Sequence, residues 1–147
     1  MAAVNTRRVL LGALAGGVVW NIWSIGINTV VLGARTQAAQ EAGDFLRQPR
    51  YPFPLFLGTW IVMLFVLAYI LAWLYASARA TRGAGPGTAL LIGLVVGFAA
   101  GFPNNFATST WAPFSRLFPL WWMLELWVGA ILAALVAGWI YRDVAAA

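Results

Sequence analysis

The sequence has no cysteine, no histidine and no lysine among its 147 residues. Without cysteine and histidine, the chain cannot form disulfides, thiolate nucleophiles, the usual zinc sites, His-ligated haem or an imidazole general base. Without lysine, Schiff-base chemistry with retinal or pyridoxal phosphate is excluded. No serine-nucleophile motif and no pair of intramembrane carboxylates takes their place. We therefore expect no catalytic residue, no metal site and no cofactor, and a protein that is not an enzyme.

Charge is also scarce. Charged residues make up 9% of the chain and hydrophobic residues 63%, whereas soluble domains carry about 25% charged and roughly 45–50% apolar residues. The net charge of +5 comes from nine arginines and four acids. Because the arginines stand as singles and pairs beside apolar runs, they indicate membrane topology rather than nucleic-acid binding. The expected environment is the lipid bilayer.

Four apolar runs are each long enough to cross a bilayer, which takes roughly 20 helical residues. They are continuous and do not alternate, so they predict helices rather than barrel strands. The prediction is an all-α fold: one polytopic domain over residues 1–147, a four-transmembrane-helix bundle with a third helix broken or kinked near Pro103. The predicted helices cover about residues 9–34, 53–78, 88–110 and 117–141. A short helix at 37–42, ended by Gly43, is expected in the first connection.

The even number of spans places both termini on one side of the membrane. Five arginines are expected on that side and four on the other, which by the positive-inside rule favours cytoplasmic termini. The five are Arg7, Arg8, Arg79, Arg82 and Arg142, and the four are Arg35, Arg47, Arg50 and Arg116.

Small residues recur at helical spacing in the last two spans. The row Gly93, Gly97 and Gly101 is a doubled GxxxG, and Gly129 and Ala133 form a similar stripe. Such rows let helix backbones approach closely, since lipid tails provide no hydrophobic drive for helix association. They predict packing inside the bundle or, as the alternative, the face of a homodimer.

Polar residues inside the spans are costly unless they have partners, so they are the best pointers to a site. In the first span three of them fall on one stripe, and Glu125 lies one turn before Gly129 and so faces the bundle. Because successive helices run in opposite directions, the polar residues gather toward the membrane face away from the termini. We predict a polar recess there, formed by Asn21, Ser24, Asn28, Asn104, Asn105, Thr108, Arg116 and Glu125.

Two functions fit such a recess. If its residues serve helix packing through hydrogen bonds, the protein is a non-enzymatic accessory or assembly subunit. If they bind a ligand, the protein is a small ion or solute channel or transporter that uses Glu125 and the asparagine cluster. The expected partners are the lipid bilayer and another membrane protein or a second copy of the chain, with no nucleic acid.

The segments VVWNIWS and VLGAR in the first span, and LWVGAILAALVAGWIY in the last, resemble the small four-helix integral membrane proteins of unknown function found in bacteria. This resemblance implies a multi-pass protein of the bacterial inner membrane and supplies no catalytic residues. The stretch from Gly101 to Thr110 is similar to the third helix of small dual-topology fluoride channels. The chain departs from those channels in its polar first connection, in its uncharged first helix and in Glu125, so their function is not transferred.

Overall fold

The computed structural model describes residues 4–143, and the regular secondary structure within that range is helical. Four spans are long and apolar enough to cross a membrane, namely Thr6–Val31, Phe53–Arg82, Pro86–Trp111 and Leu117–Ile140. The predicted all-α, four-span fold is confirmed. In chain order the elements are α1 (Thr6–Gly26), the π-helical segment η1 (Ile27–Val31), α2 (Gly33–Ala42), α3 (Phe53–Arg82), α4 (Pro86–Trp111) and α5 (Leu117–Ile140).

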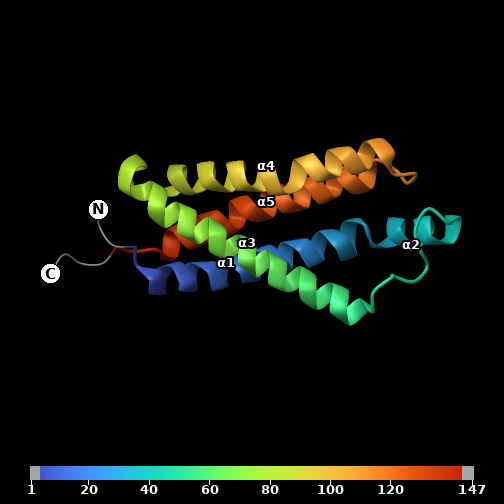
Figure 1. The fold of residues 1–147 in the computed structure, drawn as a ribbon, viewed down its shortest axis with the longest axis horizontal. Helices are drawn as coiled ribbons and strands as arrows, with labels where there is room; N and C mark the ends of the chain where they lie inside the picture. The colour runs from blue at the N-terminus through green and yellow to red at the C-terminus, as the bar shows by residue number, and fades with distance from the viewer. Residues whose placement is uncertain (1–3, 144–147) are drawn as a thin grey trace.

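Helix α5 makes the most extensive contacts with the other helices, packing against α1, α3 and α4. Figure 1 shows α4 lying along α5, while α3 crosses over α1. The first and last described residues and the α3–α4 turn share one end of the bundle, which we call the terminal end; α2 lies at the other, the α2 end. Toward the α2 end α3 diverges from the α4–α5 pair.

The first two spans differ from their predicted limits. Helix α1 starts at Thr6 rather than residue 9 because the Asn5 side chain accepts a hydrogen bond from the Arg8 backbone N–H at 3.2 Å, which caps the helix. The first span ends at Val31, in the π-helical turn η1. Helix α3 continues to Arg82, past the predicted residue 78, because the helix meets no breaker before Gly83, whose φ is +87°.

The connection after the first span contains the expected short helix, α2, which ends at Gly43 in the left-handed region with φ +89°. Beyond it the Phe45 ring packs against two rings near the start of α5. Its centroid lies 4.6 Å from that of Phe114 and 4.7 Å from that of Phe118. This aromatic contact ties the connection to α5.

Pro103 does not break the third span, because α4 is continuous from Pro86 to Trp111. A proline inside a helix lacks one N–H donor, so the carbonyl four residues earlier loses its partner. Side chains beside the proline donate to other backbone carbonyls: Asn105 Nδ2 to Gly101 O at 2.7 Å and Thr108 Oγ1 to Asn104 O at 2.9 Å.

Glycines of α4 lie directly against α5. A Cβ atom added at Gly93 would stand 2.7 Å from the Ile131 Cα, and one added at Gly101 would stand 3.0 Å from the Met123 carbonyl oxygen. Gly97 faces Ala130 in the same way, at 2.8 Å from its Cβ. The row of small residues therefore packs two helices of the same chain together.

Small residues also bring α1 close to α5. A Cβ atom at Gly16 would lie 2.8 Å from the Ala133 carbonyl oxygen, and one at Gly129 would lie 2.2 Å from two atoms of the Trp20 ring. Trp20 is fully buried in a central cluster with Leu64, Leu71 and other apolar residues. The core of the bundle is thus a tryptophan ring enclosed by alanine, glycine and leucine.

Candidate functional site

The only acidic side chain within the four spans, Glu125 of α5, is buried, with 1% of its surface exposed. Both carboxylate oxygens accept hydrogen bonds from the first span. Ser24 Oγ donates to Oε1 at 2.5 Å, and Asn28 Nδ2 donates to Oε2 at 2.9 Å. Three polar residues predicted from the sequence to meet are therefore in direct contact.

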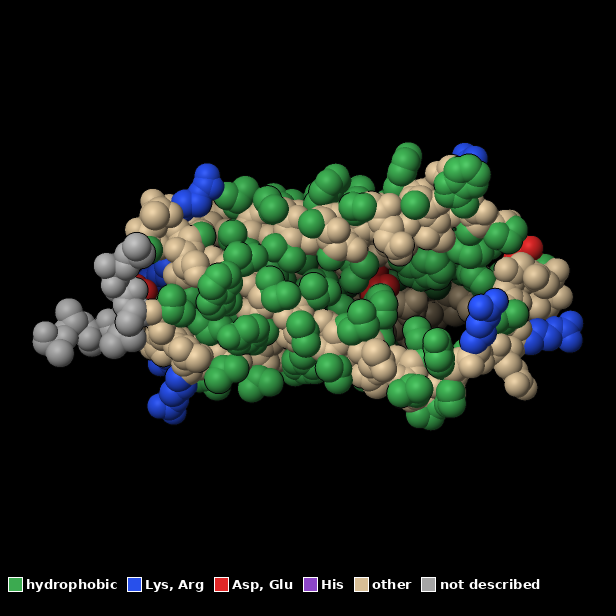
Figure 2. Space-filling view, in the orientation of Figure 1, with side chains coloured by type: hydrophobic (Ala, Val, Ile, Leu, Met, Phe, Trp, Pro, Cys, Tyr) green, Lys and Arg blue, Asp and Glu red, His purple; other side chains and the backbone are tan. Residues whose placement is uncertain are grey.

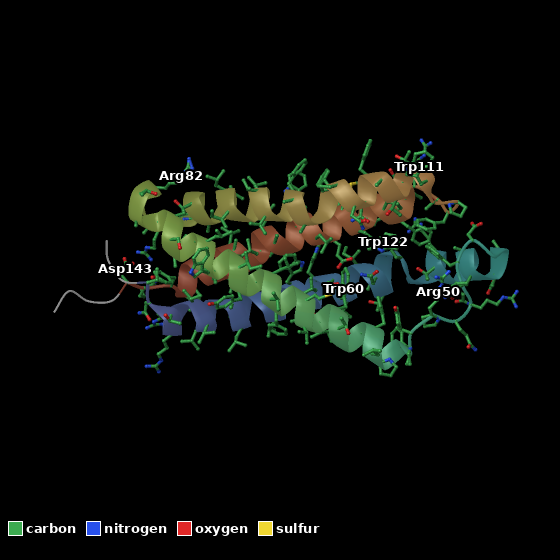
Figure 3. All side chains as sticks on the ribbon, viewed as in Figure 1. Arg50, Trp60, Arg82, Trp111, Trp122 and Asp143 are labelled. Carbon is green, nitrogen blue, oxygen red and sulfur yellow. The ribbon has the colours of Figure 1, made fainter. Side chains whose placement is uncertain are left out.

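A fourth side chain joins this group from α3. The Trp60 indole N–H donates to Ser24 Oγ at 3.1 Å, so the serine hydroxyl accepts from α3 and donates to α5. Figure 3 shows Trp60 between the middle of the bundle and the α2 end. We call Ser24, Asn28, Trp60 and Glu125 the Glu125 network; it links α1, η1, α3 and α5.

The donors that reach the carboxylate are neutral. Within residues 4–143 the one ion pair joins Arg79 to Asp143, at the terminal end. Arg116, a predicted member of the recess, is exposed and does not pair with Glu125. The physical reason is helical rise: nine residues of helix separate two positions by about 13 Å, and Arg116 lies just before the first turn of α5.

Two other asparagines predicted in the recess, Asn21 and Asn105, bond within their own helices. Asn21 is buried and donates to Gly17 O at 2.8 Å, while Asn105 is buried and donates to Gly101 O. Asn104 is exposed, and Thr108 donates to its backbone. None of them is hydrogen-bonded to Glu125 among the described residues. The side-chain amide of an asparagine in a helix can donate to the carbonyl four residues earlier. A buried asparagine therefore does not need a hydrogen-bond partner on another helix.

The network reaches the molecular surface on one side. Ser24 and Glu125 are buried, whereas Asn28 is exposed. Figure 2 shows the face of the bundle hollowed toward the α2 end, with acidic surface inside the hollow. The opening lies where α3 diverges from α4 and α5 (Figure 1).

Toward the terminal end the helices are closed by apolar packing. The central cluster around Trp20 adjoins a second cluster of buried Ala, Val and Tyr side chains that includes Val9, Ala72 and Ala137. The Trp20 Nε1 atom is buried there without a hydrogen-bond partner among the described residues. The Glu125 network is therefore open to one side and packed shut on the other.

Sequence reasoning assigned no role to two tryptophans that contact the site. Trp60 donates to Ser24, and the Trp23 indole N–H donates to the Glu125 backbone carbonyl at 3.1 Å. The sequence does indicate that tryptophans can join a polar site, since an indole N–H inside a bilayer requires an acceptor. However, the chain has nine tryptophans, and which of them face an acceptor depends on helix rotation.

Replacing Trp60 with phenylalanine should reduce the free energy of unfolding by about 0.6–1.7 kcal/mol, which spans the mean and the maximum found for interhelical hydrogen bonds in a membrane protein. The change keeps an aromatic ring and removes the donor to Ser24. Reversible unfolding in mixed detergent micelles measures the effect. Trp139→Phe is the matched control, because Trp139 is 76% exposed; equal losses in the two variants would contradict a role for the Trp60 hydrogen bond.

The chemistry open to this arrangement is narrow. The described residues contain no group of three or more His, Cys, Asp or Glu side chains that could hold a metal ion. A single carboxylate bonded to a hydroxyl and an amide can bind a donor group or join helices. Comparisons of the chain with protein-family models, with curated proteins and with solved structures found no match.

Proposed function

We propose that this protein is a non-enzymatic, multi-pass membrane subunit that acts in the assembly of, or as an accessory to, another membrane protein. The observation that carries the proposal is the one-sided network. Its polar groups bond to one another, and apolar clusters separate them from the terminal end. A recess of this form suits holding helices in place more than passing a solute across the membrane.

The surface offered to a partner is the first third of α3. Residues 53–63 contain no buried side chain, whereas Leu64 and several later residues of the helix are buried. Gly58 and Thr59 are exposed on this segment, and a Cβ atom at Gly58 would meet nothing within 4 Å. Small exposed residues permit close approach of a second membrane helix. We call residues 53–63 the free segment of α3.

The Glu125 network supports this surface. Through Trp60, which belongs to the free segment, it holds α3 to α1 and α5. From Trp60 toward the α2 end the segment diverges from α4 and α5, as Figure 1 shows. The network is thus a positioning device, and the free segment of α3 is the contact surface.

The membrane and orientation form part of the same proposal. The resemblance to small bacterial four-helix proteins favours the bacterial inner membrane. The excess of arginine on the terminal side, five against four, favours cytoplasmic termini.

A small channel or transporter is the second candidate, favoured by the exposure of Asn28 beside a buried carboxylate. Flux measurements on purified protein in liposomes separate the two functions. Gradients of sodium, potassium, chloride and protons are followed with fluorescent dyes. If the role is accessory, liposomes that contain wild type or Glu125→Gln should show no more flux than liposomes without protein. Flux that is present in wild type and abolished by Glu125→Gln would replace the accessory role with transport.

Cross-linking in native membranes tests the contact surface directly. A photo-reactive residue at Thr59 should give one discrete cross-linked product with another membrane protein or a second copy. The same residue at Val95, which is 58% exposed on α4, should give none. Products of equal yield from both positions would show that the free segment of α3 has no special role.

A further inference from the structure

A second site lies at the terminal end, far from the Glu125 network. It is a pocket of about 400 Å³ bounded by the end of α3, the start of α4 and the end of α5. Basic and aromatic side chains form much of its lining, among them Tyr75, Arg79, Trp139 and Arg142. Figure 3 shows Arg82 and Asp143 at this end, and Arg50 and Trp111 at the other.

Arg79 is held rigidly in this pocket. Its guanidinium carbon lies 5.0 Å from the centroid of the Tyr141 ring, and its Nη2 lies 2.8 Å from Asp143 Oδ2. The Arg79 side chain is 14% exposed, whereas that of Asp143 is 53% exposed. The guanidinium is thus already oriented toward an anionic oxygen at the rim, and several of its five N–H donors remain available.

Arg142 and Tyr75 add further donors. Arg142 Nη1 donates to the carbonyls of Trp139 at 2.7 Å and Tyr141 at 2.9 Å, which fixes the position of its guanidinium. The Tyr75 hydroxyl accepts from the Gly85 N–H at 3.2 Å. Its own hydrogen has no acceptor among the described residues. Two oriented guanidiniums and a free hydroxyl are donors suited to phosphate oxygens.

The charge around the pocket is strongly positive. The described residues at the terminal end contribute five arginines and one acid, Asp143, a net charge of 5 − 1 = +4. The walls below the charged rim are apolar, with Ala89, Leu135 and Trp139 among the lining residues. A positively charged rim next to apolar walls is complementary to a phospholipid, which has an anionic headgroup joined to acyl chains. Basic pockets between membrane helices bind such headgroups.

We propose that this pocket binds the phosphate of an anionic phospholipid through Arg79 and Arg142, with an acyl chain lying against Leu135 and Trp139. Asp143 occupies part of the oxyanion position on Arg79 and moves away from Arg79 when lipid binds. The inference is independent of the proposed function, since it concerns the opposite end of the bundle.

Native mass spectrometry in detergent micelles tests the site, with phosphatidylglycerol as the probe and phosphatidylcholine as the neutral comparison. Wild type should bind one phosphatidylglycerol about tenfold more tightly than phosphatidylcholine. Arg142→Gln should weaken phosphatidylglycerol binding by about fivefold, the effect of removing one basic residue near anionic lipid. Asp143→Asn should tighten it, because the competing carboxylate is gone.

The control is Arg116→Gln, which removes an exposed arginine at the α2 end and should leave binding unchanged. Because Arg142 also bonds to backbone carbonyls, a second variant is Arg82→Gln, which removes an exposed arginine at the end of α3 outside the pocket lining and should weaken binding in the same direction by lowering the positive charge of the terminal end. Equal affinity for both lipids, or an equal loss in Arg116→Gln, would overturn the proposal. Displacement of the lipid by inorganic phosphate at the same concentration would overturn the lipid assignment in favour of a soluble phosphate ligand.

Discussion

Replacing Gly129 with alanine is expected to lower the free energy of unfolding by about 2–3 kcal/mol. The added methyl group would lie 2.2 Å from both Cδ1 and Nε1 of Trp20. Trp20 has no exposed surface and packs among Leu64, Ala68 and Ala130, so its ring cannot move aside without displacing them. The cost of overpacking should exceed the roughly 1 kcal/mol that alanine gains over glycine in a helix.

Gly58→Ala is the matched control for this prediction. It is the same substitution in a membrane helix, at a position where a Cβ atom meets nothing within 4 Å. It should be neutral or stabilise the protein by up to about 1 kcal/mol. Unfolding followed by tryptophan fluorescence in mixed micelles measures both variants. Equal effects would mean that the α1–α5 approach is looser than the structure shows.

Replacing Glu125 with alanine should destabilise the protein by about 2–4 kcal/mol. The change removes the acceptor of the buried Ser24 hydroxyl and of the Asn28 amide. The buried Ser24 hydroxyl, left without an acceptor, costs more than the lost hydrogen bond was worth, because no water replaces the acceptor in a buried site. The Asn28 amide is exposed and keeps its bond to the Ser24 carbonyl at 3.0 Å. The α1–α5 contact should therefore weaken at the α2 end while the terminal end stays packed.

Two further variants separate the network from the effect of removing an acid. Glu125→Gln should cost less than Glu125→Ala, since its carbonyl can accept from Asn28 and its amide can donate to Ser24 Oγ. Glu41→Ala removes an exposed acid on α2 and should change stability by less than about 0.5 kcal/mol. If Glu125→Ala proves as mild as Glu41→Ala, the network does not hold the helices together.

The residues of the Glu125 network show where sequence reasoning succeeded. The stripe of Ser24 and Asn28 and the position of Glu125 one turn before Gly129 predicted that they face the bundle, and the structure brings them together. The same reasoning also placed Asn104 in the recess, but its side chain is exposed. Helical periodicity tells which residues share a face. It does not tell which way the face of one helix turns relative to another.

The tilt of the helices determines which residues of different helices come into contact, and the sequence does not predict that tilt. Trp60 enters the site because α3 crosses α1 at that level. Residues 53–59 have no buried side chain because α3 diverges from α4 and α5 toward the α2 end (Figure 1). Arg79 and Asp143, more than sixty residues apart in the chain, meet only because α3 and α5 end at the same face. No local sequence pattern predicts either contact.

The amino-acid sequence by itself determined the environment, the helical class and the number of spans. A chain that is 63% hydrophobic with four long apolar runs must satisfy its backbone hydrogen bonds within helices once it is in lipid. The tertiary structure alone decided which polar groups pair and where the bundle opens. Those outcomes depend on helix rotation and crossing, and both are set by the summed fit of small and large side chains between helices.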